Sequence, residues 1–274
     1  MYFDGYVMGD LLKLLLESFP KIILPGLTIT LPLTALSFAC ALVIAVIVAL
    51  IQLANIPVLK QICRAYIWIM RGTPLLIQLY IVFFGLPSIG IYLDPIPAAL
   101  LVFSLNEGAY CAETIRGALE SVPKGQIEAG YCVGMKFPSI MWHVVLPQAF
   151  KTAFPALSNS LIGMVKDMSL AANIAVMEMF YTTQRIVAVT YESLALYIEL
   201  ALVYLLFCTV LTLLQRFVEK KIDVNRRKPK AVPVYLGTGS HIIPTPDSFR
   251  KREKEQAPDS FRRKEADGQE GGRS

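Results

Sequence analysis

Long charge-free stretches alternate with short polar segments along most of the chain. No Asp, Glu, Lys or Arg occurs between Lys21 and Lys60 or over residues 72–93, and only Glu199 interrupts residues 193–215. A membrane-spanning helix needs about 20 mostly apolar residues, and each of these three runs is long enough. The pattern predicts an all-α, polytopic membrane protein.

Five predicted spans account for the whole pattern: 22–52, 72–92, 95–112, 152–165 and 193–214. The third contains Asn106 and Glu107, and the fourth is short and ends at Lys166. A charge at the centre of a spanning helix costs a few kcal/mol. Glu107 and Lys166 therefore either lie near the membrane surface or border a translocation path, and the sequence leaves both interpretations open.

Charge between the spans indicates the topology. Fifteen of the 26 Lys and Arg residues lie from Arg216 onward, directly after the last span. Basic segments remain on the cytoplasmic side of a membrane. Five spans then place the N-terminus outside. We expect an extracytoplasmic segment over 1–21, a transmembrane domain over 22–222 and a charged cytoplasmic tail over 223–274.

The tail differs in composition from the rest. It holds the imperfect repeat "PDSFRKRE" and "PDSFRRKE", and it has too few apolar residues to bury a core, so disorder is predicted. A short interaction motif used twice is the alternative. The nine acidic residues from Glu219 onward argue against a nucleic-acid partner.

The predicted cytoplasmic loop 114–151 contains the segment "QIEAGYCVGMKFPSIMWHVVLPQAF". Ile127, Tyr131 and Met135 recur at four-residue spacing, which predicts a helix with one apolar face. Gly130 and Gly134 cost about 1 kcal/mol each against alanine in a helix, so both are expected at a close approach. Pro138 predicts a break before a second apolar run. The loop is thus predicted to be a small helix–turn–helix docking element.

Glu128-Ala129-Gly130, followed by Gly134 and Leu146-Pro147, resembles the EAA loop of permease subunits in ATP-binding-cassette importers. "AYCAETIRG" and "RGTPLLIQLY" are similar to the polar amino acid branch of that family. "GLPSIGIYLDPIPAAL" is most similar to cystine-type members. The likeness covers roughly residues 20–222.

The resemblance implies a type I importer permease in the bacterial cytoplasmic (inner) membrane. Its expected partners are cytoplasmic ATPase subunits, a second permease subunit (identical or homologous), an extracytoplasmic solute-binding protein and the lipid bilayer. The residues expected to couple the chain to the ATPase are those of the loop motif: Glu128, Ala129, Gly130, Gly134, Leu146 and Pro147. Leu146 and Pro147 are expected to fix the angle at which the chain leaves the loop.

The chain contains no GxxxxGK[ST] phosphate-binding motif. No cofactor, metal site, disulfide or catalytic residue is expected, and ATP should be used by the partner subunit. His143 is interpreted as a packing or surface residue. Two alternatives are an autonomous secondary amino acid transporter, which typically shows paired inverted repeats, and a membrane-embedded enzyme. Neither a repeat of the spans nor a convergent catalytic set stands out.

Four polar residues of the third span and its end are candidates for the translocation path: Asn106, Glu107, Tyr110 and Glu113. Asn106, Tyr110 and Glu113 are spaced four and then three residues apart, so they share a helix face. Glu113 and Arg116 are also three apart, and a structural ion pair between them is the alternative.

Overall fold

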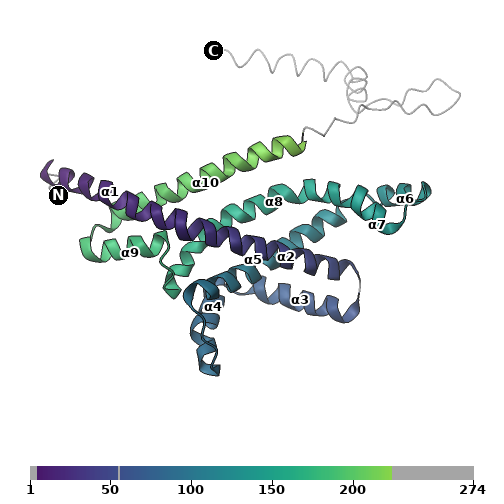
Figure 1. Ribbon diagram of the computed structural model, residues 1–274, viewed down its shortest axis with the longest axis horizontal. Helices are drawn as coiled ribbons and strands as arrows, with labels where there is room; N and C mark the ends of the chain where they lie inside the picture. The colour runs from purple at the N-terminus through teal and green to yellow at the C-terminus, as the bar shows by residue number, and fades with distance from the viewer. Residues whose placement is uncertain (1–4, 55, 224–274) are drawn as a thin grey trace, which may run out of the picture. The chain divides into compact units, whose positions relative to one another are not determined.

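The computed structural model describes residues 5–54 and 56–223, and within these ranges every regular element is helical (Figure 1). The prediction of an all-α protein is confirmed. The tail expected over 223–274, with its repeat, falls outside the described residues apart from Asp223. The same holds for the first four residues of the predicted segment 1–21.

The chain begins with one long helix. α1 (Gly5–Pro25) continues through a π-helical turn (Gly26–Thr30) into α2 (Leu31–Leu53), and Gly9–Leu53 is long and apolar enough to cross a membrane. Its 45 residues extend about 67 Å at 1.5 Å per residue, against a hydrocarbon core of about 30 Å. The predicted span 22–52 thus lies inside a longer helix, and the missing charges mark only the apolar part of that helix.

Three π-helical turns interrupt the helices, and each precedes a Leu-Pro pair. They are Gly26–Thr30 before Leu31-Pro32, Ile81–Gly85 before Leu86-Pro87, and Met141–Val145 before Leu146-Pro147. Proline lacks an N–H and its ring clashes with the carbonyl four residues earlier. In each case the preceding leucine N–H bonds to the carbonyl five residues back, so the wider turn accommodates the proline without ending the helix.

The second predicted span is preceded by a separate helix. α3 (Pro57–Gly72) meets α4 (Leu75–Tyr80) at a bend, and α4 continues through the π turn to a 3₁₀ helix (Leu86–Ile89). The axes on either side of the bend differ by 105°. Thr73 is extended, with φ −119° and ψ 143°, because the ring of Pro74 excludes the helical region for the residue before it.

α5 (Pro95–Glu120) packs against α2, α3 and α8 (Leu146–Asp167). Its contact with α2 is made through small side chains, including buried Ala109 on α5 and Ala41 and Ala45 on α2. At Gly108 an added Cβ would lie 3.1 Å from side-chain atoms of Ile44 and Tyr66. Small residues allow close backbone approach, a common way of packing membrane helices.

The remaining helices are α6 (Lys124–Cys132), α7 (Phe137–Ile140), the 3₁₀ helix Met168–Ile174, α9 (Met179–Thr190) and α10 (Ser193–Asp223). Among the described helices, Gly9–Leu53 and Ser193–Ile222 qualify as membrane spans alone. Two bent pairs raise the number to as many as four: Pro57–Gly72 with Leu75–Ile89, and Phe137–Ile174 with Met179–Thr190. α5 is long enough, at 26 residues, but Asn106 and Glu107 lower its hydropathy.

Two buried carboxyl groups connect α10 to its neighbours. Glu178 caps α9 by accepting a 2.7 Å hydrogen bond from the Tyr181 N–H, and the hydroxyl of Tyr204 on α10 lies 3.1 Å from its other oxygen. Glu199 on α10 lies 2.5 Å from the hydroxyl of Ser18 on α1. The charge that interrupts the last apolar run is thus used in a helix contact.

Candidate functional site

A polar cavity of about 550 Å³ lies where the α3–α4 bend, α5 and α8 meet. Three of the four predicted path residues line it together: Asn106, Glu107 and Tyr110. Glu113, one turn further along α5, does not. The other lining residues are Arg71, Gly72, Thr73, Pro74, Leu75, Ser160, Gly163, Asp167 and Leu170.

Asn106 holds the bend between α3 and α4. Its side-chain amide donates 3.0 Å hydrogen bonds to the carbonyl of Met70 and to Oε1 of Gln78. The amide nitrogen of Gln78 lies 3.0 Å from the same carbonyl and 2.7 Å from the Thr73 hydroxyl. Carbonyls at a helix end lack helical partners, and these two buried amides supply donors there. Asn106 therefore has a structural role as well as a place in the cavity wall.

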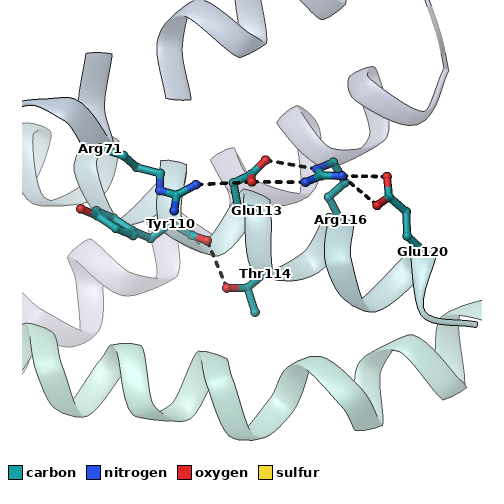
Figure 2. A network of polar contacts seen from close by, with 6 residues as sticks. All are labelled: Arg71, Tyr110, Glu113, Thr114, Arg116 and Glu120. Atoms are coloured by element: carbon teal, nitrogen blue, oxygen red, sulfur yellow. Dashed lines mark hydrogen bonds and ion pairs between the residues drawn. The ribbon is translucent and has the colours of Figure 1, made fainter. Parts of the chain in front are cut away.

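Arg71, in the last turn of α3, joins this cavity to a network on α5 (Figure 2). Its guanidinium lies 5.3 Å from the centre of the Tyr110 ring, a cation–π contact. It also lies 3.3 Å from a carboxylate oxygen of Glu113. Glu113 in turn binds Arg116 through 3.1 and 3.2 Å hydrogen bonds, and Arg116 contacts both oxygens of Glu120 at 2.8 Å.

Glu113 thus forms the ion pair with Arg116 that their spacing permits. Hydrogen bonds from Arg116, supported by Arg71, hold the pKa of the Glu113 carboxyl below its ordinary value. Glu113 lies beyond the predicted span 95–112 and lines a second, smaller pocket of about 250 Å³ with Arg116 and Glu120. On α5, the face shared by Asn106, Tyr110 and Glu113 therefore serves two different pockets.

Glu107 and Lys166 have different surroundings. Glu107 lines the polar cavity, where its Oε1 lies 3.5 Å from the thiol of Cys111. Lys166 lines a separate cavity with Tyr204 and Cys208 of α10, while its neighbour Asp167 faces the cavity of Glu107. Two carboxyl groups and the guanidinium of Arg71 thus share one polar space.

Sequence reasoning missed Arg71, Asp167 and Ser160 as cavity residues. Arg71 lies on α3, and Ser160 and Asp167 lie on α8, whereas the four candidates lie on α5. No spacing along the chain therefore connects these residues to the candidates. The run Arg71-Gly-Thr-Pro did carry a signal, because glycine and the residue before proline mark a helix end. It did not indicate which helix the bend would face.

The segment with the EAA-like motif forms a helix–turn–helix. Gly134, two residues after the end of α6, is left-handed, with φ +78°. The N–H of Gly134 bonds to the carbonyl of Tyr131 and that of Met135 to the carbonyl of Gly130, both at 3.0 Å. These two bonds define a Schellman motif, which satisfies the last carbonyls of a helix. The break lies at residues 133–136, so the expectation that Pro138 produces it was wrong; Pro138 lies inside the first turn of α7.

The two glycines of the motif have different roles. A Cβ at position 130 would lie 2.8 Å from Cγ1 of Ile140, a fully buried residue of α7, so Gly130 is at the predicted close approach. A Cβ at position 134 would meet nothing within 4 Å. Within the described chain Gly134 makes no close contact, and its positive φ gives a separate reason for glycine there.

Several side chains of this segment are exposed. Glu128 and Ala129 are exposed on α6, and Tyr131, Val133 and Trp142 are 53%, 75% and 70% exposed. Tyr131 therefore lies outside the apolar face predicted with Ile127 and Met135, which both pack on a buried cluster around Ile140. The ring nitrogen of His143 lies 3.0 Å from the Ser139 carbonyl. A compact turn thus presents aromatic and apolar surface beside one carboxylate.

Leu146 and Pro147 do not redirect the chain. The helix runs on from α7 through the π turn Met141–Val145 into α8, so Phe137–Ile174 forms one member of a bent pair. Leu146 packs on the cluster around Ile140, while Pro147 is exposed. The chain therefore leaves the loop along the axis of α8, because the wider turn accommodates the proline within the helix.

Comparison with known proteins gives a consistent result. Residues 41–224 match the model of the family described as binding-protein-dependent transport system inner membrane component. The chain is 43% identical over 208 residues to the L-cystine transport system permease protein TcyB of Bacillus subtilis, which covers 76% of this chain and 89% of the relative. It is 36% identical to the L-cystine transport system permease protein TcyL of the same organism, over 82% of this chain and 94% of the relative.

Solved structures show the same architecture. A chain of the crystal structure of an amino acid ABC transporter with histidines is 30% identical, covers 81% of this chain and all of its own length, and superposes with a TM-score of 0.70. An inward-facing structure of the MetNI methionine ABC transporter, at 18% identity and a TM-score of 0.59, shares the fold. The chain therefore belongs to the family of inner membrane components of binding-protein-dependent transport systems, the permease subunits of ATP-binding-cassette importers.

Proposed function

We propose that this chain carries amino acids across the bacterial cytoplasmic membrane as the permease subunit of an ATP-driven importer, with cystine as the first candidate substrate. The names of two similar proteins, both L-cystine permeases, support the choice of cystine. The polar cavity of the permease is the observation that carries the proposal.

The cavity suits the charges of an amino acid. Arg71, held by Glu113 and the ring of Tyr110, would offer its remaining N–H groups to an α-carboxylate at one side. Glu107 and Asp167 would bind an α-ammonium group. Its volume of about 550 Å³ lies within the range of roughly 300–1,000 Å³ for small-molecule sites. Charged groups within membrane helices are costly unless they face water or one another, and a translocation path provides that environment. In this proposal Asn106 and Tyr110 position Arg71 and the bend.

The helix–turn–helix at α6 and α7 is the proposed docking site for an ATPase subunit. Glu128 and Ala129 are exposed for contact, whereas Gly130 and Gly134 maintain the turn. Because α7 continues into α8, a displacement of the turn moves the wall of the cavity as a rigid body. ATP is then hydrolysed by the partner, and this chain is not itself catalytic.

The remaining partners follow from the same proposal. A second permease subunit completes the path, and an extracytoplasmic solute-binding protein delivers the amino acid. The N-terminus lies outside and the C-terminus lies in the cytoplasm, so that α6 and α7 face the ATPase. The positive charge after the last span supports this orientation.

The cavity is tested by uptake of labelled cystine, with other amino acids as competitors, in proteoliposomes holding the assembled importer. Glu107→Gln and Asp167→Asn remove a negative charge each, and we expect a higher KM for uptake in both. Glu192→Gln, outside the cavity on the link to α10, is the matched control. Unchanged kinetics in both cavity variants would remove these carboxyl groups from the path.

Docking is tested by co-purification of the ATPase subunit with Glu128→Lys. Gln126→Lys places a lysine two residues earlier on α6 and controls for the added positive charge, and Glu128→Gln separately removes the negative charge. We expect the Glu128→Lys variant to lose ATPase binding and uptake while remaining in the membrane. Uptake by the wild-type chain without an ATPase, driven by an ion gradient, would instead favour the autonomous secondary transporter.

A further inference from the structure

A second polar pocket, of about 250 Å³, lies where α2 ends, α3 begins and α5 ends. It is distinct from the candidate translocation cavity, and the proposed transport function does not use it. Its lining is dominated by long polar side chains: Gln52, Lys60, Arg64, Glu113, Arg116 and Glu120, with Leu53 and Ile67.

One buried group in this pocket lacks a partner. Gln52 is 9% exposed, and its side-chain amide nitrogen has no hydrogen-bond partner in the described part of the chain. An unsatisfied buried donor costs about 1–3 kcal/mol. Gln52 belongs to the last turns of α2, a helix whose preceding residues carry no charge back to Lys21. The amide donor of Gln52 is therefore open to a polar ligand in the pocket.

The charges of the pocket favour an anion. Lys60, Arg64 and Arg116 line it, against the two carboxylates of Glu113 and Glu120. Both carboxylates are bound to Arg116, Glu113 at 3.1 Å and Glu120 at 2.8 Å. Arg64 is exposed and is not a member of any of the ion pairs found among the described residues. One positive charge is thus left over beside the amide donor of Gln52.

We propose that this pocket binds a phosphate group, with Gln52 and Arg64 as donors. Guanidinium and amide N–H groups are the usual donors to phosphate oxygens, and arginine presents two of them in a fixed plane. The pocket lies at the end of the apolar run of α2, where the hydrocarbon of a bilayer gives way to its headgroups. An anionic phospholipid and free phosphate share this chemistry, and the experiment separates them.

The test uses the full-length chain in lipid nanodiscs and in detergent, with three variants. Gln52→Met removes the buried amide at similar volume, and Arg64→Gln removes the exposed charge. Arg185→Gln makes the same change as Arg64→Gln at an exposed position of α9 that does not line the pocket. The readouts are retention of phosphatidylglycerol over phosphatidylcholine by native mass spectrometry, and the shift of the thermal unfolding midpoint with inorganic phosphate at constant ionic strength.

We expect about tenfold weaker binding in Gln52→Met and in Arg64→Gln, because each variant loses one hydrogen bond to a charged group. Binding by Arg185→Gln should not change. Retention of phosphatidylglycerol without a phosphate shift identifies the lipid as the ligand, and a phosphate shift identifies the free anion. Equal binding by wild type and both pocket variants would overturn the proposal. An equal loss in Arg185→Gln would overturn it too, because general charge would then explain the binding. Since Arg64 is exposed, its variant remains informative if Gln52→Met fails to fold.

Discussion

The backbone of Gly130 on α6 lies directly against the side chain of Ile140 on α7, so that a Cβ at position 130 would lie 2.8 Å from Cγ1 and 2.9 Å from Cδ1 of Ile140. Ile140 is fully buried and has little room to move. This contact brings the two helices of the turn together, and with the left-handed Gly134 it determines the shape of the proposed docking site.

Gly130→Ala should therefore destabilise the chain relative to the same change at Gly125, which lies in α6 and would meet nothing within 4 Å. We expect a difference of about 1–3 kcal/mol, typical of overpacking, measured by unfolding in detergent. In an Ile140→Ala background the overlapping atoms are absent and the difference should vanish. A difference that persists in that background would assign the effect of Gly130 to something other than this contact.

Gly134→Ala should be destabilising for a different reason. Position 134 has φ +78° and open space around it, so the cost is that of the backbone alone, about 1–2 kcal/mol. Gly134→Asn should cost less, because asparagine tolerates the left-handed region better. Gly117→Ala, at an exposed α5 position with free space, is the control. Equal unfolding temperatures for the alanine and asparagine variants would contradict this explanation.

Asn106→Leu should lower stability by about 1–3 kcal/mol, because the carbonyl of Met70 and Oε1 of Gln78 each lose a buried donor. Asn173→Leu removes only a local, exposed hydrogen bond to Leu170, so its effect should stay within about 0.5 kcal/mol. Chemical unfolding of both variants makes the comparison. If the two variants are equally stable, Asn106 does not hold the bend.

Glu113→Gln should change the pH dependence of stability. The pKa of Glu113 is lowered in the folded chain by Arg116 and Arg71, so its ion pairs stabilise the fold above the ordinary glutamate pKa of about 4.3. This contribution is lost as the pH falls through the lower folded value. The variant should unfold at a lower temperature than wild type at pH 7, and the gap should narrow on acidification. A gap that is constant with pH would show that the ion pairs do not contribute.

The residues that surround the polar cavity come from helices far apart in the chain. Asn106, Glu107 and Tyr110 could be named from the sequence because they interrupt one apolar run. Arg71 and Asp167 could not be connected to them, since the bend at Thr73 and the packing of α5 between α3 and α8 bring them together. The same packing directs Lys166 into a different cavity.

The sequence by itself determined that this is a membrane protein of helices with a helix–turn–helix between two of them. The length of a charge-free run and the positions of glycine and proline affect the local backbone, so they can be interpreted without knowing the tertiary structure. Only the tertiary structure decided that the helix of α1 and α2 begins long before its apolar run, and that Leu-Pro pairs sit inside continuous helices. It also decided that Gly130 allows close packing against Ile140, whereas Gly134 allows a positive φ. Those outcomes depend on which helix surfaces pack against each other. The spacing of residues along the chain defines the faces of one helix but does not say which other helix a face will contact.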